Sequence, residues 1–282
     1  MNRDNRIKVF AQTTAIASQK FYSDRKGNII QLPSIVGDSF FYNKEINPKQ
    51  AKEYDKEEII VENKDCLELA KELVDNGFKP AVLNMASEHM PGGGVLKGSG
   101  AQEENLFRRT NLFQSLYRYH KIGKLFNVPK DKHNNKYPLD ENYGGIFSKN
   151  VVVFRKSENA NYDFLNKPFL VDVISVAAIR RPKYNENLEL SKEDIIKEKN
   201  KIRTILNIAL EHGNDSLILG ALGCGAFQTP PKAMAKYFHE VINEETYKNK
   251  FKVIAFAIIN SNSNYQTHNP EGNFKPFKDE FS

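Results

Sequence analysis

Residues 89–110, HMPGGGVLKGSGAQEENLFRRT, place five glycines within nine positions and then lead into a predicted helix that carries two adjacent glutamates. Glycine loses more conformational freedom on folding than other residues, so a run of glycines indicates a backbone that something approaches closely. An apolar run at residues 81–86 precedes the stretch, and residues 102–122 carry apolar side chains at helical spacing. A glycine turn between a buried strand and a helix is typical of α/β proteins.

Strands and helices alternate along the rest of the chain. Apolar and β-branched runs predict further strands at residues 59–63, 151–155, 169–179, 216–222 and 251–259. Helical periodicity and capping residues predict helices at residues 65–76, 191–213 and 230–242. Because several strands are apolar throughout, this order predicts an α/β/α sandwich with a largely buried sheet. A polar helix opens the chain, so we expect an N-terminal helical extension, residues 1–57, packed on a catalytic domain of residues 58–282.

The composition narrows the class of protein. A chain of 282 residues with 40% hydrophobic residues and 19 Phe can bury a core, which excludes global disorder. Its net charge of +6 favours a polyanionic partner, although a solvated lysine-rich surface explains it equally well. Two cysteines are too few for a disulfide framework. The first residues lack the apolar segment of a signal peptide, and no apolar run is long enough to span a membrane, so we expect a cytoplasmic protein.

A second glycine-rich turn, Gly220-ALGCGAF, also lies between a predicted strand and a predicted helix. Helix N-termini present free N–H groups, and glycines allow a phosphate to approach them. Neither glycine segment matches a P-loop or the dinucleotide fingerprint G-x-G-x-x-G. Each is therefore either a phosphate cradle of another type or a structural turn. The similar placement of the two favours a ligand that carries a diphosphate.

The adjacent carboxylates of Glu103 and Glu104 need not be catalytic, because acidic residues are common in the first turn of a helix. Successive helical residues point about 100° apart, so the two cannot face one bond equally. One glutamate can reach a ligand while its neighbour supports the loop. A general acid needs a raised pKa, whereas a helix N-terminus lowers the pKa of a carboxyl group. Burial and the ligand's phosphates would have to outweigh that effect.

The spacing of these motifs resembles the GGG-(6 to 8)-QEE signature of the microbial-type poly(ADP-ribose) glycohydrolases, since seven residues separate Gly94 from Gln102. The turn Gly223-CGAF resembles the diphosphate-binding turn of that family, and Val151-VVFRKS, Val173-ISVAAIRRP and Val253-IAFAII extend the similarity along the chain. The resemblance implies a macrodomain-like α/β/α sandwich with a mixed central sheet. It also implies a hydrolase that acts on O-glycosidic ribose linkages of poly(ADP-ribose) or of ADP-ribosylated protein or nucleic acid.

The same resemblance assigns roles to individual residues. It makes Glu104 the general acid/base and Glu103 its neighbour in substrate positioning, and Asn84 a contact of the ribose. The remaining substrate contacts would be Gly92, Gly93, Gly94, Gln102, Gly223, Cys224, Gly225, Ala226 and Phe227. The chain departs from the family at Leu222, where Trp is usual, and at Gln228-Thr229, where Gly-Asn is usual. These departures affect the walls of the pocket and hence the substrate preference.

No cofactor or metal is expected, because the six histidines and two cysteines show no ligand spacing. Cys224 could be a reactive thiol near a helix N-terminus, but we favour a small loop residue since no histidine stands in a partner position. Basic residues that follow Glu104, from Arg108 to His120, could face the polyanion or form a solvated helix face. A binding module that recognises ADP-ribose without cleaving it remains the main alternative, and a nucleotide phosphatase a weaker one. We expect a monomer.

Overall fold

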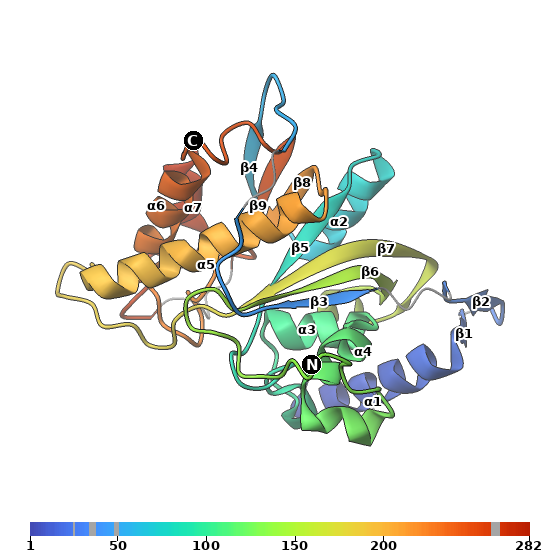
Figure 1. Cartoon of the computed structure of the whole chain (residues 1–282). Coiled ribbons are helices and arrows are strands. Elements are labelled where there is room, and N and C mark those ends of the chain that lie inside the picture. Colours follow the sequence, from blue (N-terminus) through green and yellow to red (C-terminus); the bar gives the residue numbers. More distant parts are fainter. Residues whose placement is uncertain (25, 34–37, 48–50, 261–265) are drawn as a thin grey trace. The chain divides into compact units, whose positions relative to one another are not determined.

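The computed structural model describes residues 1–282 except 25, 34–37, 48–50 and 261–265 (Figure 1). The described chain divides into two compact units. The first unit comprises residues 1–41, 86–138 and 146–173, and the second comprises residues 42–85, 139–145 and 174–282. The proposed boundary near residue 57 remains a prediction. Among the described residues, no helix has both the length and the apolar composition that a bilayer span requires.

The helices and strands follow the alternation expected from the sequence. The helices are α1 (Arg3–Gln19), α2 (Cys66–Asp75), α3 (Gln102–Arg109), α4 (Leu112–Leu116), α5 (Lys192–Glu211), α6 (Pro231–Ile242) and α7 (Phe274–Glu280). The strands are β1 (Phe21–Ser23), β2 (Ile29–Gln31), β3 (Ser39–Tyr42), β4 (Glu58–Glu62), β5 (Pro80–Met85), β6 (Gly145–Arg155), β7 (Phe164–Val176), β8 (Ser216–Leu219) and β9 (Val253–Ala257). Short 3-10 turns occur at Val95–Lys97, Tyr117–Tyr119, Lys121–Phe126 and Glu158–Ala160.

Seven strands form one mixed sheet in the order β3-β6-β7-β5-β8-β9-β4, and β1 and β2 form a separate antiparallel pair. The pairs β5–β8, β8–β9 and β9–β4 are parallel. In these pairs Pro80 lies opposite Ser216, and Val253 lies opposite both Ser216 and Glu58. The four strands therefore start at one edge of the sheet and end at the other. The architecture confirms the predicted α/β sandwich with a mixed sheet.

In the second unit, local sequence signals define the helix ends. The carboxylate of Asp65 accepts hydrogen bonds from the backbone N–H groups of Leu67 (3.0 Å) and Glu68 (3.1 Å), which fixes the start of α2. Ser191 caps α5, and Pro231 occupies the first turn of α6. Helix α6 packs against both α5 and α7 (Figure 1). Helix α7 was not expected from the sequence.

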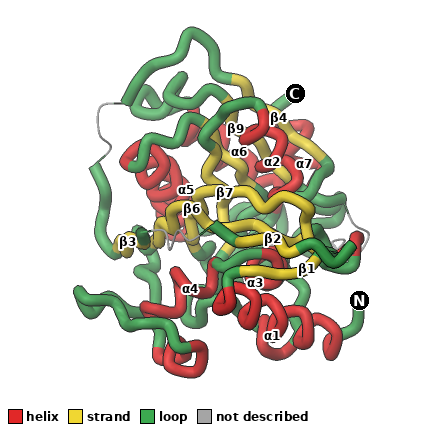
Figure 2. Tube along the Cα trace, turned by 90° about the vertical axis from the view of Figure 1, so that its right-hand side faces the viewer, coloured by secondary structure: helices red, strands yellow, loops and turns green. Residues whose placement is uncertain are grey.

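In the first unit, α1 packs against α3, and Figure 2 shows the two helices side by side. Phe10 of α1 is buried, and its ring lies 6.2 Å from those of both Phe107 and Phe113. The hydroxyl of Thr13 donates to the carbonyl of Arg108 at 2.6 Å. The N-terminal helix therefore shares a core with the helix that carries the two glutamates.

The single helix predicted for residues 102–122 was wrong. The chain leaves the helix at Thr110, whose extended backbone (φ −139°) pairs with Val153 of β6. The Thr110 hydroxyl donates to the carbonyl of Leu106 (2.8 Å) and accepts from the N–H of Leu112 (3.1 Å). A strand pairing and a side-chain hydrogen bond thus replace the helical pattern that the apolar spacing predicts.

Candidate active site

The glycine loop, residues 86–101, joins β5 to α3 and wraps around the side chain of Glu103. Glu103 is only 4% exposed. Its Oε2 accepts a hydrogen bond from the N–H of Ser87 (2.8 Å), and its Oε1 accepts from the N–H of Gly92 (2.9 Å). Two charge-assisted bonds from the backbone make this carboxylate an anchor for the loop. Ser87 was not singled out from the sequence, because its contribution comes from the backbone.

Glu104 lies beside this anchor in a different setting. Its Oε1 accepts from the N–H of Gly94 at 2.8 Å. Its Oε2 is buried and has no hydrogen-bond partner among the described residues, and the residue as a whole is 6% exposed. A buried polar atom without a partner costs free energy and therefore marks a possible contact for a ligand or water. One oxygen is thus oriented by the backbone and the other is available.

The glycines of the loop lie against the protein itself. A Cβ at Gly93 (φ +52°) would lie 2.7 Å from Oε1 of Glu104 and 3.1 Å from Oε2 of Glu103. A Cβ at Gly92 would lie 2.6 Å from the ring of Phe107. A Cβ at Gly94 would overlap the side chain of Ser99. Bare backbone at these positions lets the loop reach the carboxylates, a reason for the glycines that could not be predicted from the sequence.

Two of the basic residues after Glu104, Arg108 and Arg109, do not present an exposed face to a polyanion. Arg108 and Arg109 are buried, at 0% and 2% exposed. The Nε of Arg109 donates to the carbonyl of Arg155 at 3.3 Å. Arg118 and His120 follow the break at Thr110 and are not on α3. The imidazole of His120 accepts from the N–H of Ile122 (3.2 Å), and burial lowers its pKa, so this histidine is a capping group.

Asn84 lies in β5, in the second unit, and is fully buried. Its Nδ2 donates to the hydroxyl of Ser175 at 3.0 Å. Its Oδ1 is buried without a hydrogen-bond partner in the described part of the chain. A side chain held by one end, with its acceptor unpaired, is able to accept a hydrogen bond from a ligand hydroxyl.

The second glycine turn, residues 220–229, joins β8 to α6. A Cβ at Gly223 (φ +75°) would lie 2.6 Å from the hydroxyl of Thr229 and 2.7 Å from the Cβ of Ala178, so the turn needs glycine there. Gly225 and Ala226 are exposed, and no described atom lies within 4 Å of a Cβ placed on Gly225. The carbonyl of Phe227 accepts from the N–H of Arg181 at 2.7 Å. One side of the turn is therefore packed and the other is open.

Cys224 fits the role of a small loop residue. It is fully buried, and its Sγ lies 3.4 Å from the carbonyl oxygen of Leu222. Burial, and to a lesser extent the negative charge of Glu198, raise the pKa of the thiol well above its usual value. A thiol held in its neutral form is a poor nucleophile. The carbonyl of Cys224 lies 2.9 Å from Nε2 of the buried His268.

A buried carboxylate behind this turn was missed from the sequence. Glu198 of α5 is fully buried, and its Oε1 accepts from the N–H of Ile179 (3.2 Å) and from the hydroxyl of Thr229 (3.4 Å). Burial raises the pKa of Glu198 to about 7, and the nearby charge of Lys201 opposes this rise. Glu198 lies within an amphipathic helix, and nothing in the sequence distinguishes it from the solvent-exposed glutamates of such a helix. Across the described residues, no group of His, Cys, Asp and Glu could hold a metal ion.

Comparison with known proteins identifies the family. The family model "Microbial-type PARG, catalytic domain" matches residues 11–156, which include the glycine loop and both glutamates. PARG stands for poly(ADP-ribose) glycohydrolase. No curated protein matches the chain.

Several solved structures share the fold. Poly(ADP-ribose) glycohydrolase from Thermomonospora curvata is 24% identical, with a TM-score of 0.79 over 99% of this chain and 100% of that chain. The same enzyme bound to the inhibitor ADP-HPD has a TM-score of 0.77, with the same identity and coverage. The enzyme from Deinococcus radiodurans in complex with ADP-ribose is 25% identical, with a TM-score of 0.61 over 80% of this chain and 85% of that chain. The family match covers more than half of the sequence, and the chain therefore belongs to the microbial-type poly(ADP-ribose) glycohydrolases, which are glycoside hydrolases.

Proposed function

We propose that Glu104 is the general acid/base that cleaves the O-glycosidic bond at the anomeric carbon of an ADP-ribose unit. The observation that carries this proposal is the asymmetry of its carboxylate. Oε1 is fixed by the N–H of Gly94, whereas the buried Oε2 has no hydrogen-bond partner among the described residues. A proton on Oε2 can be donated to a leaving oxygen while Oε1 stays in place.

The reaction follows from the chemistry of glycosides. Glycoside hydrolysis passes through an oxocarbenium-like transition state, in which the leaving oxygen gains a proton as its bond to carbon breaks. Glu104 donates that proton, and the resulting carboxylate then removes a proton from the attacking water. The negative diphosphate of the ligand stabilises the positive charge that develops on the ribose. Glu103 contributes indirectly, because its backbone contacts shape the loop beside Glu104.

ADP-ribose binding is assigned to three groups of residues. The open side of the Gly223–Phe227 turn presents exposed backbone at Gly225 and Ala226, which suits a diphosphate. The Oδ1 of Asn84, which has no hydrogen-bond partner among the described residues, accepts a hydrogen bond from a ribose hydroxyl. Gly92, Gly93, Gly94 and Gln102 contact the ribose and the phosphates nearest the cleaved bond. The Deinococcus radiodurans relative, which was solved in complex with ADP-ribose, supports this choice of ligand.

We propose that the macromolecular substrate is poly(ADP-ribose), with ADP-ribosylated protein or nucleic acid as further targets. We propose that the chain acts as a monomer in the cytoplasm, where its two free cysteines suit a reducing compartment. A panel of polymer, modified protein and modified nucleic acid tests the substrate, and light scattering tests the monomer.

The decisive experiment compares the parent protein with Glu104→Gln, which keeps the shape of the side chain and removes its acid/base function. Release of ADP-ribose from poly(ADP-ribose) is followed by chromatography, and binding of free ADP-ribose is followed by calorimetry. We expect the variant to lose at least about 10²-fold in turnover, a typical contribution of acid–base catalysis, while it still binds ADP-ribose. Tight binding without turnover by the parent would instead identify a module that only recognises ADP-ribose.

A further inference from the structure

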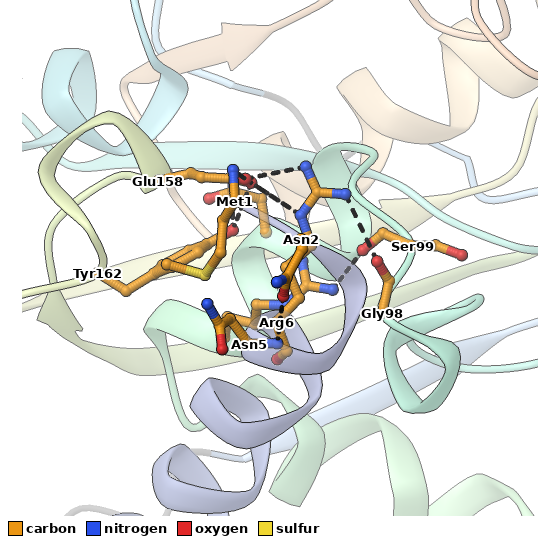
Figure 3. A network of polar contacts seen from close by, with 10 residues as sticks. Met1, Asn2, Asn5, Arg6, Gly98, Ser99, Glu158 and Tyr162 are labelled. Carbon is orange, nitrogen blue, oxygen red and sulfur yellow. Dashed lines mark hydrogen bonds and ion pairs between the residues drawn. The ribbon is translucent and has the colours of Figure 1, made fainter.

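The C-terminal end of the glycine loop is attached to the N-terminal helix. Figure 3 shows Arg6 of α1 between Glu158 and the loop residues Gly98 and Ser99. The Nη2 of Arg6 lies 2.9 Å from Oε1 of Glu158, and its Nη1 lies 3.5 Å from the carbonyl oxygen of Gly98. The side chains of Arg6 and Glu158 are 23% and 18% exposed, so solvent screens this pair only in part.

Two glycines of the loop make room for this helix. A Cβ at Gly100 would lie 2.5 Å from Nη1 of Arg6, and a Cβ at Gly98 would overlap the backbone of Arg3. The contacts with Arg3 and Arg6 are enough to account for glycine at both positions, without any contact to a ligand. Gly98 and Gly100 therefore allow α1 to approach the loop, as Gly92 and Gly93 allow Phe107 and the carboxylates to approach it.

Glu158 is held in its charged form. Burial on its own raises the pKa of Glu158, but hydrogen bonds from Arg6, from the amino group of Met1 and from Tyr162 together keep it below its usual value. The hydroxyl of Tyr162 donates to Oε2 of Glu158 at 3.1 Å and accepts from Nδ2 of Asn105 on α3 at 3.3 Å. The Met1 amino group and the Tyr162 hydroxyl therefore hold the Glu158 carboxylate in place for its ion pair with Arg6.

Arg108 completes the attachment from α3. It is fully buried, and its Nη2 donates to the carbonyl of Ser99. Its Nε donates to the carbonyl of Arg6 at 3.2 Å, and its guanidinium lies 5.9 Å from the centre of the Tyr162 ring. Arg108 follows Glu104 by four residues, so both side chains lie on the same face of the helix.

A short chain of hydrogen bonds joins this attachment to Glu104. The N–H of Ser99 donates to the carbonyl of Gly94 at 3.2 Å. The N–H of Gly94 in turn donates to Oε1 of Glu104 at 2.8 Å. Movement of Ser99 therefore displaces the peptide that orients the carboxylate, with only Gly94 between them.

We propose that Arg6 and Arg108 are positioning residues, which hold the loop at Gly98–Ser99 so that the Gly94 N–H meets Glu104. The pair of arginines and Glu158, here named the Arg6 clamp, makes α1 part of the catalytic unit. The proposal rests on the function proposed for Glu104. Because the clamp acts on loop geometry, it also has a consequence that can be measured without turnover.

The test uses the full chain and compares Arg6→Ala with Lys8→Ala, which removes a charge from an exposed position on the same helix. Amide hydrogen exchange is measured at Gly94 and Ser99, together with kcat and KM on poly(ADP-ribose). For Arg6→Ala we expect exchange at these amides to accelerate at least about 10-fold, while amides of α6 keep the parent rate. We expect kcat to fall about 10-fold with KM changed less than 3-fold, since the clamp orients the acid and contacts no substrate.

Two further variants keep the outcome interpretable. Glu158→Gln removes the charge that holds Arg6, and should accelerate the same amides by a smaller factor. Arg6→Lys retains the ion pair and should recover part of the lost kcat. Exchange and kcat at the level of Lys8→Ala in both Arg6→Ala and Glu158→Gln would overturn the proposal. An inactive parent with accelerated loop exchange in Arg6→Ala would refute the function of Glu104 and leave the clamp supported.

Discussion

The close approach of Gly93 to Glu104 predicts that Gly93→Ala will damage catalysis far more than stability. A Cβ at Gly93 lies 2.7 Å from Oε1 of Glu104. Restoring van der Waals contact requires a shift of roughly 0.8 Å, since non-bonded atoms prefer separations near 3.5 Å. The oxygen cannot move that far without losing the 2.8 Å bond from Gly94. A misplacement of about 1 Å can cost about 10² in rate, so we expect kcat to fall by about that factor.

A matched control variant, Gly77→Ala, separates the effect of backbone strain on stability from the effect of the Glu104 contact on catalysis. Gly93 has a φ of +52°, and placing alanine in this left-handed region costs roughly 1–2 kcal/mol. Gly77 also has a positive φ, of +82°, but no described atom lies within 4 Å of its Cβ position. Gly77→Ala should therefore destabilise the fold by a similar ~1–2 kcal/mol and leave kcat unchanged.

Urea denaturation measures the free energy of unfolding of both variants, and initial rates on poly(ADP-ribose) measure kcat. The contact with Glu104 is the feature that distinguishes Gly93 from Gly77. If both alanine variants kept the kcat of the parent, the carboxylate would not depend on the loop in the way that the structure implies. If both lost activity equally, backbone strain alone would explain the result. Either outcome would refute the reasoning.

Three further predictions concern the buried groups. Glu103→Ala leaves the N–H groups of Ser87 and Gly92 without their acceptors, and should lower the free energy of unfolding by roughly 2–6 kcal/mol in urea denaturation. Burial raises the folded-state pKa of Glu198 from 4.5 to about 7, so its contribution to stability is present below pH 4.5 and is lost as the pH rises through 7. In the parent protein this group should lower the free energy of unfolding by at most about 3 kcal/mol between pH 4.5 and pH 7. Glu198→Gln should abolish that decrease, as urea denaturation at a series of pH values will show. Cys224 should resist iodoacetamide at neutral pH until the protein unfolds, as mass spectrometry of the labelled protein will show, since burial keeps its thiol protonated.

Features encoded within a few residues could be predicted from the sequence. Asp65 caps α2 and Pro231 starts α6, because capping and the fixed φ of proline act locally. The placement of each glycine turn between a strand and a helix was also predicted, since apolar runs and helical periodicity mark both flanks. The spacing of Gly94 and Gln102 led to the family, which the match over residues 11–156 confirms.

Features that depend on tertiary partners could not be predicted. The helix breaks at Thr110 because Val153, distant in the sequence, pairs with it. Arg108 follows an acidic pair and has the pattern of a solvated charge, yet it is fully buried against the carbonyls of Arg6 and Ser99. The sequence also showed that the glycines admit a close neighbour without showing which one. Most of these neighbours turned out to be side chains and backbone of the same chain.

The division of labour between the two glutamates follows from helix geometry. Consecutive residues on α3 point about 100° apart, so two adjacent carboxylates reach different parts of one loop. Glu103 meets the N–H groups of Ser87 and Gly92. Glu104 meets that of Gly94, and within the described part of the chain its other oxygen has no hydrogen-bond partner. A carboxylate with both oxygens bound by the backbone is poorly suited to exchange protons, because protonation would break a charge-assisted bond. The neighbour with one unpaired oxygen can bind a proton at that oxygen without losing a loop contact. Glu103 is therefore the anchor of the loop, and the same geometry supports our proposal that Glu104 is the acid.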